Sequence, residues 1–267
     1  MHGLPPAAVE RLNRAKRSGV RTSLLSAPSA AGIKAVGLEP VGEVMGCVVL
    51  STVTTNRPFV GYRFNLDACA TPYLQALHTG YNTALERLRE EARALGADGV
   101  VDIRLSLSSL GQADEFLAMG TAVRAQSRTR PKSLFTTDLS GSDVAKLMLA
   151  GWVPVQVEWV GAATAIRTGI GTQSQTSYYA GNMEVDSYTR LINHVRADAR
   201  TRFHDMVRKA GAEGGIVNRM SLSTWEPGEQ IVAALASVYG TAIAQFHRGP
   251  AAPARTLTVM PLRRQGE

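Results

Sequence analysis

The sequence has few of the residues that indicate covalent crosslinking or a membrane environment. Among its 267 residues there are two cysteines, and aromatic residues make up 6%. Two cysteines are too few for a disulfide framework or for a closed metal site made of thiolates alone. The longest apolar run, residues 231–243, is well short of the roughly 20 residues that cross a bilayer. We therefore expect no insertion into a membrane.

A secretory signal is also missing from the start of the chain. The first residues, MHGLPPAAVERLNRAKR, do not show a basic region followed by an apolar run. Hydrophobic residues nevertheless make up 45% and charged residues 19%, which is typical of a globular protein. We therefore expect a cytoplasmic, folded protein.

Basic charge is absent from the central part of the chain. The net charge is +7, and residues 1–21 and 247–267 together account for all of it, which leaves residues 22–246 formally neutral. A nucleic-acid-binding domain usually concentrates basic residues on a folded face. We therefore do not expect nucleic-acid binding by the core, and only the two basic ends remain as an alternative site for nucleic acid or an acidic protein.

One passage occurs twice. ALGADGVVDIRLSLS at residues 94–108 closely matches KAGAEGGIVNRMSLS at residues 209–223, an offset of 115. Further on, MGTAV at 119–123 matches YGTAI at 239–243, an offset of 120. Repeats at this spacing indicate duplicated domains. We predict a basic segment at 1–21, a first module at 22–128, a second module at 132–247, and a tail rich in proline, alanine and arginine at 248–267.

Each copy contains the same order of elements. A strand, at 43–51 or 152–160, is followed by a long helix that ends at a glycine, Gly96 or Gly211, and then by two more strands. The first helix has one apolar stripe with spacings of three and four, made by Leu74, Leu77, Tyr81, Leu85, Leu88, Ala92 and Leu95. The fold class is therefore α+β, with two β-α-β-β modules that each place a long helix on a small antiparallel sheet.

The last strand of the first copy is apolar on both sides. Phe116 and Ala118 point one way, while Leu117, Met119 and Val123 point the other. One helix covers only one face of a sheet, so the second face needs cover from the other module or from another chain. We infer that the modules pack edge to edge or face to face in an oligomer.

The first copy resembles a known family. EPVGEVMG at 39–46, EARALGADGVVDIRLSLS at 91–108 and AMGTAV at 118–123 are similar to the YbjQ-like family of heavy-metal-binding domains. The resemblance covers residues 38–126 and, more weakly, 133–246. It implies a dodecin-like fold that assembles as rings, typically pentamers, and the family name implies binding of a divalent transition metal. No ligand motif is carried over by the resemblance.

Metal binding must therefore be judged on the donors of this sequence, and the candidates are Cys69, His78, His194 and His204. None of them belongs to a CxxC, HxxxH or HExxH arrangement. His194 and His204 are ten residues apart on one helix, roughly 15 Å along its axis, so one ion cannot join them without another ligand. Cys69 and His78 flank a helix start and could share a metal with a neighbouring subunit. The alternatives are solvent-facing histidines and an ordinary loop thiol, while Cys47 is interpreted as a small core residue.

Both copies keep an arginine at one strand position, Arg104 and Arg219. Such a pair could line the pore of a ring, pair with Asp102 or Glu115 at an interface, or be solvated. We favour an ion pair or an interface over ligand binding. The interface or pore candidates are thus Arg104, Arg219, Leu117, Met119 and Val123.

No Ser/His/Asp order or paired carboxylate stands out as catalytic. We therefore expect a non-enzymatic, homo-oligomeric binding or scaffold protein, in which metal binding is implied by the family resemblance alone. A two-layered pentamer is the first expectation. The alternatives are binding through the basic ends and a small-molecule enzyme with its site at the module junction.

Overall fold

The computed structural model describes residues 4–18, 22–51, 67–127 and 130–246. Strands β1 (Leu38–Ser51), β2 (Gly99–Ser109), β3 (Ala113–Ala125) and β4 (Phe135–Thr136) form sheet A in the order β1-β3-β2-β4. Strands β5 (Trp152–Arg167), β6 (Gly214–Gly228) and β7 (Ile231–Gln245) form sheet B in the order β5-β7-β6. The α-helices are α1 (Pro6–Ser18), α2 (Ala27–Ala35), α4 (Asp67–Ala94), α5 (Gly141–Leu149), α6 (Ile170–Gln175) and α7 (Asp186–Lys209), and a 3-10 turn spans Tyr178–Ala180.

The repeated order of elements is confirmed. In each half a first strand, a long helix and two further strands follow one another, and the long strands of each sheet pair antiparallel. Both long helices end before a glycine with positive φ, +67° at Gly96 and +69° at Gly211, a conformation that other residues rarely adopt. The fold class is α+β, as the sequence predicted. No described helix is long and apolar enough to cross a membrane.

Close approach of α4 to sheet A depends on a glycine. A Cβ atom at Gly46 would overlap the backbone carbonyl of Ala84 and lie 2.6 Å from the amide nitrogen of Leu88. Because both atoms belong to the helix backbone, a larger side chain would force α4 away from the sheet. The neighbouring Val44 and Val48 face the same helix and are buried with Leu88.

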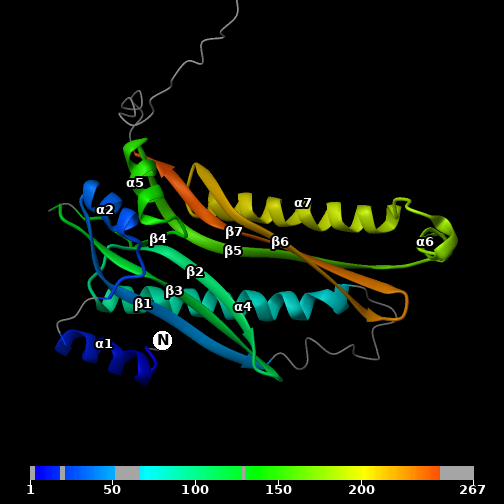
Figure 1. The fold of residues 1–267 in the computed structure, drawn as a ribbon, viewed down its shortest axis with the longest axis horizontal. Helices are drawn as coiled ribbons and strands as arrows, with labels where there is room; N and C mark the ends of the chain where they lie inside the picture. The colour runs from blue at the N-terminus through cyan, green and yellow to red at the C-terminus, as the bar shows by residue number, and fades with distance from the viewer. Residues whose placement is uncertain (1–3, 19–21, 52–66, 128–129, 247–267) are drawn as a thin grey trace, which may run out of the picture.

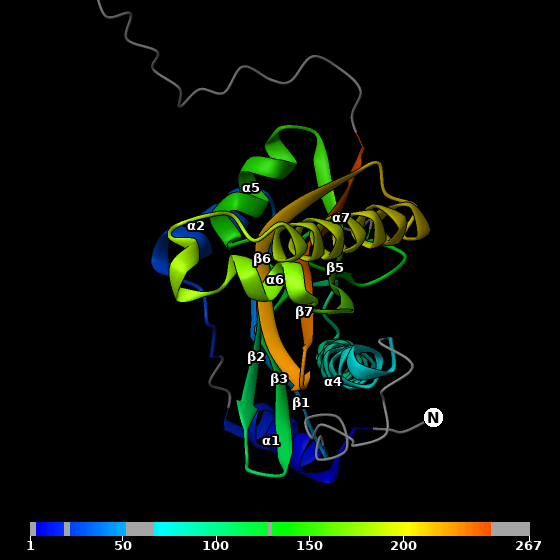
Figure 2. The same cartoon turned by 90° about the vertical axis from the view of Figure 1, so that its right-hand side faces the viewer.

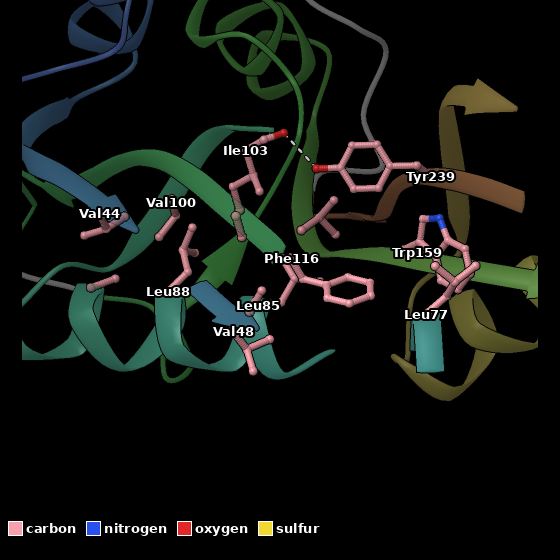
Figure 3. Packing of buried hydrophobic residues seen from close by; sticks show 14 of the residues in the cluster. Val44, Val48, Leu77, Leu85, Leu88, Val100, Ile103, Phe116, Trp159 and Tyr239 are labelled. Atoms are coloured by element: carbon pink, nitrogen blue, oxygen red, sulfur yellow. Dashed lines mark hydrogen bonds between the residues drawn. The ribbon is translucent and has the colours of Figure 1, made fainter. Parts of the chain in front are cut away.

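Helix α4 has a second partner, because sheet B lies on its other side. Figure 1 shows α4 and α7 on opposite sides of sheet B, and Figure 2 shows the same layers from the end of the helices. Trp159 and Tyr239 of sheet B belong to the same buried cluster as Leu85 and Leu88 of α4 (Figure 3), and Val157 belongs to it as well. The main core therefore joins the two halves of the chain.

The other face of sheet B packs against its own helix α7. Leu191, Val195, Ala199 and Phe203 of α7 are buried there with small residues of β5 and β7. Gly215, which stands where the first copy has Val100, leaves space that Phe203 fills: a Cβ on Gly215 would lie 2.8 Å from its ring. The change from valine to glycine is thus compensated by a larger residue on the helix.

The face of sheet A that points away from α4 is here called the outer face of sheet A. At one end, α2 and α5 pack on it, and Ile33, Val123 and Val144 are fully buried there. The amide of Leu24 also donates a hydrogen bond of 3.0 Å to the Thr121 hydroxyl. This part of the chain therefore supplies its own cover for one end of the face.

The exposed edges of β1 and β5 are protected by side chains of the long helices. Arg87 of α4 donates to the carbonyl of Cys47, and Arg202 of α7 donates to the carbonyl of Gly161 over 3.3 Å. Because Arg87 and Arg202 are separated by the repeat offset of 115, this protection is duplicated along with the fold. Occupied edge groups discourage pairing with another sheet.

Glu91 completes the protection of β1 and holds the N-terminal helix. Its side chain is fully buried, accepts a hydrogen bond of 2.8 Å from the amide of Met45, and forms an ion pair with Arg11 of α1. Helix α1 therefore lies beside the β1 edge (Figure 2). Arg11, one of the basic residues of the N-terminal segment, is therefore neutralised by an acidic residue of the folded part.

The predicted division into modules at 22–128 and 132–247 stays a prediction. Strand β4, which falls within the predicted second module, pairs in parallel with β2 of sheet A through Gly99–Phe135 and Val100–Thr136. A Cβ on Gly99 would overlap the Phe135 ring, so the two segments are in direct contact. The start of the second half thus completes the first sheet.

Candidate functional site

A pocket lies at the junction of the two sheets, which we call the junction pocket. Its volume is about 520 Å³, within the range of small-molecule sites. Residues of β2 line it from sheet A, and residues of β5, β6 and β7 line it from sheet B. The lining consists of Tyr81, Asp102, Ile103, Arg104, Leu105, Asp138, Trp159, Asn218, Arg219, Ser221, Ser237 and Tyr239. Both repeated arginines therefore face the same cavity.

Arg104 has an ionic partner in its own strand. Its guanidinium lies 2.8 Å from the carboxylate of Asp102, and most of the arginine side chain is exposed. A β-bulge between Val101 and Arg104 makes this contact geometrically accessible, since Asp102 has a positive φ of +54°. The bulge turns both side chains toward the pocket. The predicted ion pair with Asp102 is present, whereas the predicted interface role stays a prediction.

Arg219 occupies the equivalent place in sheet B, where β6 also has a bulge between Val217 and Arg219. Val217 stands where the first copy has Asp102, so no carboxylate adjoins Arg219 along the strand. Within the described residues Arg219 forms no ion pair. The two copies therefore present different chemistry: one arginine is neutralised and the other is available to an anion.

Asp138 is the most buried acid of the pocket lining. One carboxylate oxygen, Oδ1, accepts a hydrogen bond from the hydroxyl of Thr241, while Oδ2 is buried and has no hydrogen-bond partner in the described chain. Burial raises the pKa of Asp138, and the hydrogen bond from Thr241 partly offsets that rise. Asn218 lowers the same pKa further, without reaching Oδ2 in hydrogen-bonding geometry. A buried acceptor without a partner is rare and marks a candidate binding group.

Aromatic side chains form the apolar part of the pocket. The hydroxyl of Tyr239 donates a hydrogen bond of 2.7 Å to the carbonyl of Ile103 (Figure 3). Burial raises the pKa of Tyr239 well above its ordinary value; the nearby Asp138 charge adds to that rise and Arg219 opposes it. The rings of Tyr81 and Trp159 are in contact, with centroids 4.9 Å apart. Together they make a largely preformed wall.

The histidines predicted as metal ligands are not brought together. His78, His194 and His204 are all exposed, and His78 is hydrogen-bonded at 2.8 Å to Asn82 of its own helix. His194 borders a shallow pocket over α7, beside Arg167 and Arg190. The side chain of Cys69 lies outside the described residues. Among the described residues, no group of three or more histidine, cysteine, aspartate or glutamate side chains is placed to hold an ion, so these donors do not fit a closed site within one chain.

The predicted interface residues are distributed differently. Leu117 and Met119 lie on the outer face of sheet A and are half-buried, together with Met45 and Cys47 of the neighbouring β1. None of these four belongs to a buried apolar cluster of the described chain. Val123 is fully buried under α2 and α5, so it is not available to a neighbour.

Cys47 is not the core residue that the sequence indicated. It is half-buried on the outer face, where its thiol donates to the Glu115 carboxylate across 3.3 Å. Burial raises the pKa of the Cys47 thiol, and the hydrogen bond to Glu115 adds to the rise. The apolar run containing Cys47 hid the alternation, because both faces of β1 carry apolar residues.

Sequence reasoning identified the arginines of the junction pocket but missed Asp138, Trp159 and Tyr239. One signal was present: Asn218 is polar at a position that is Ile103 in the first copy. The loop TTDLSGSD gives no comparable signal for Asp138, because Ser140, two residues on, caps α5 and accounts for the polar composition of the loop. The pocket arises from the packing of the two halves, which the sequence alone does not specify.

Comparison with known proteins is consistent with the repeated fold. Residues 30–126 match the family YbjQ_1, described as "Putative heavy-metal-binding". The chain is 31% identical over 238 residues to "Encapsulin nanocompartment protein Rv1762c" of Mycobacterium tuberculosis, covering 86% of this chain and 87% of that protein. It is 35% identical over 88 residues to a UPF0145 protein of Thermosipho africanus, covering 33% of this chain and 82% of that protein. A UPF0145 protein of Thermotoga maritima is 36% identical over 89 residues, covering 33% of this chain and 84% of that protein.

Proposed function

Because the chain belongs to the YbjQ-like (UPF0145) family, we propose that it is a non-enzymatic binding and scaffold protein that self-associates through the outer face of sheet A. The single observation that supports this proposal is a difference between the two sheets. The equivalent face of sheet B is covered by a long helix, whereas this face of sheet A carries apolar residues that no described helix buries.

Two residue pairs occupy the same place in the two sheets. Met45 pairs with Met119 in sheet A, and Trp159 pairs with Tyr239 in sheet B. Trp159 and Tyr239 are buried against α4 of the other half. Met45 and Met119 occupy the corresponding positions but remain half-buried. A helix from outside the chain would therefore complete sheet A as α4 completes sheet B.

The occupant proposed for this face is helix α7 of a second protein chain. At the repeat offset of 115, its exposed residues Arg196, Arg200 and His204 correspond to Tyr81, Leu85 and Arg89, the side of α4 that meets sheet B. The outer face of sheet A offers Glu43 and Glu115 among its apolar residues. Basic groups on the helix and acidic groups on the sheet provide charge complementarity, which orients association.

Such a contact joins two different surfaces, so each chain binds the next one head to tail. A head-to-tail contact forms a ring when its rotation closes. We propose a closed ring, with five copies as the first expectation from the family, located in the cytoplasm. The relative named an encapsulin nanocompartment protein supports a role in an assembled protein particle.

Heavy-metal binding enters this proposal only through the description of the family. Within the described residues the donors of one chain do not gather into a site. A metal bound by this protein would need donors from more than one copy, and the proposed contact does not depend on it.

The association is tested by native mass spectrometry and by light scattering of the full chain. We expect an integer multiple of the 28.6 kDa monomer for the wild type. Arg196→Glu combined with Arg200→Glu, on an exposed helix surface, should dissociate the particle, and so should Val49→Asp on the outer face. Ile170→Asp, at a residue that is 86% exposed on α6, is the control and should leave the mass unchanged.

Circular dichroism of each variant checks that the monomer remains folded. A monomeric wild type would overturn the proposal. It would also be overturned by an oligomer that both the α7 variant and the outer-face variant leave intact, since association would then use another surface.

A further inference from the structure

The junction pocket has no part in the proposed association, so a function for it stands or falls independently. Two of its charged groups form no ion pair in the described chain. The Oδ2 atom of Asp138 is buried without a hydrogen bond, and Arg219 forms no ion pair. Arg104, by contrast, is already paired with Asp102. The pocket thus offers one free acceptor and one free cation.

The two groups without an ion pair line the same pocket as Tyr239. Asp138 and Arg219 are both close enough to the Tyr239 hydroxyl to influence it, in opposite directions. They form no ion pair with each other. A ligand that carries a positive donor and an anionic group a short distance apart would satisfy both. Leaving a buried acceptor without a partner costs free energy that such a ligand would recover.

Aromatic and apolar side chains form part of the lining, beside the polar Asn218, Ser221 and Ser237. Trp159 and Tyr239 are almost fully buried, Tyr81 is in contact with Trp159, and Leu105 lies beside them. An aromatic wall combined with placed polar and charged groups is suited to a small organic molecule that carries both a ring and charged groups. A volume of about 520 Å³ accommodates a ligand with one aromatic ring.

We propose that the junction pocket binds the zwitterion of an aromatic α-amino acid, with its ammonium group at Asp138, its carboxylate at Arg219 and its ring against Tyr81 and Trp159. The ammonium group donates to Oδ2, the one buried side-chain acceptor without a hydrogen-bond partner in the described part of the chain. The carboxylate accepts from the guanidinium of Arg219, a geometry that permits two parallel hydrogen bonds. Only the second repeat of the chain supplies this cation, since Val217 stands at the position of Asp102, the aspartate that neutralises Arg104 in the first repeat.

The proposal is tested by calorimetry and by saturation-transfer NMR on the full chain with L-phenylalanine. Two probes lack one charged group each: hydrocinnamate has no ammonium group, and phenethylamine has no carboxylate. L-phenylalanine should bind the wild type at millimolar concentrations or below and more tightly than either probe. Asp138→Asn should weaken L-phenylalanine about tenfold or more and leave hydrocinnamate unchanged. Arg219→Gln should weaken L-phenylalanine similarly and leave phenethylamine unchanged.

Arg208→Gln is the matched control, because Arg208 is exposed on α7 and pairs with Asp205 outside the pocket. It should bind all three probes as the wild type does. Circular dichroism and thermal unfolding check that the pocket variants are folded. The proposal is overturned if the wild type binds no L-phenylalanine, or if the two variants weaken all probes equally. Failure of the ring proposal would show in mass measurements and leave these results unaffected.

Discussion

The hydroxyl of Tyr239 in sheet B donates a hydrogen bond of 2.7 Å to the backbone carbonyl of Ile103 in sheet A. The two residues are 136 positions apart in the chain. The bond is buried and joins the two halves of the chain at the junction pocket, which both residues line. Ile103 lies in the bulge of β2, between Val101 and Arg104, and has no paired residue in the neighbouring strand β3.

Tyr239→Phe should therefore destabilise the protein by about 1 kcal/mol or somewhat more, because it removes the donor and leaves the Ile103 carbonyl buried. The measurement is urea unfolding followed by circular dichroism. Tyr178→Phe, at a hydroxyl on a fully exposed side chain, is the control and should be neutral. Equal stability of Tyr239→Phe and the wild type would mean that water replaces the tyrosine at this carbonyl.

Gly46→Ala should be strongly destabilising, by about 3 kcal/mol, because the new methyl group meets the backbone of α4 rather than a movable side chain. The same change at Gly171, where no atom lies within 4 Å of the added Cβ, provides the control. Denaturant midpoints of the two variants give the comparison. A small effect at Gly46 would show that α4 shifts along sheet A at little cost.

Arg202→Gln should lower stability by about 1 kcal/mol, because it removes the hydrogen bond that occupies the edge carbonyl of Gly161. It should also increase aggregation, since an unprotected strand edge pairs with other chains. Arg208→Gln, which loses only an exposed ion pair with Asp205, should cost about 0.3 kcal/mol. Thermal unfolding and light scattering during heating measure the two effects. Similar behaviour of both variants would argue against a protective role for Arg202.

The buried Glu91 predicts a pH dependence of stability. Burial raises the pKa of Glu91, while the amide of Met45 and the charge of Arg11 oppose the rise. A carboxyl group whose folded pKa lies above its unfolded pKa contributes stability that is present at low pH and lost as the pH rises through the folded pKa. Arg11→Gln removes the opposing charge and should raise the pKa of Glu91 further.

Arg11→Gln should therefore destabilise the protein by about 1 kcal/mol at neutral pH. The difference from the wild type should shrink as the pH falls toward the range in which Glu91 is protonated in both proteins. Urea unfolding at several pH values provides the curves. Arg14→Gln is the control, because Arg14 pairs with Glu10 and both side chains are exposed. If the stability difference between Arg11→Gln and the wild type does not change with pH, the prediction is wrong, because the effect of Arg11 then does not depend on the charge of Glu91.

The positions of the histidines predict the response to zinc. His194 and His204 are exposed on α7, roughly 15 Å apart along the helix axis, so they cannot share one ion within a chain. Replacing both with alanine should leave the zinc content by elemental analysis and the zinc-induced shift in Tm the same as in the wild type. Cys69→Ser, at the candidate whose side chain lies outside the described residues, is the informative comparison. A loss of bound zinc in the double histidine variant would show that the two residues bind zinc between copies.

Several features of the fold follow from local patterns. The stripe from Leu74 to Leu95 is readable as a helix because its spacing matches the helical repeat, and Gly96 marks its end because glycine accepts a positive φ. The alternation of Phe116 and Leu117 separates the two faces of a strand. Because these patterns occur in both repeats, each one supports the same inference twice, and the fold class and the family could be predicted from the sequence.

The site could be predicted only in part. Arg104 and Arg219 were identified by their repetition, but nothing local shows that one is neutralised by Asp102 and the other is free. Asp138 comes from the segment between the copies, and Trp159 and Tyr239 resemble ordinary strand residues in the sequence. Their meeting depends on contacts between separate segments of the chain, which periodicity does not encode.

The sequence by itself determined the two copies, their order of elements and the two-faced apolar strand that needs a partner. The tertiary structure decided which partner each face receives. Sheet B is covered by α4 because Tyr81 and Trp159 are large apolar rings that bury each other, whereas the outer face of sheet A retains half-buried methionines. That asymmetry arises from packing between distant segments. It creates both the junction pocket and the surface on which we propose that a second protein chain binds.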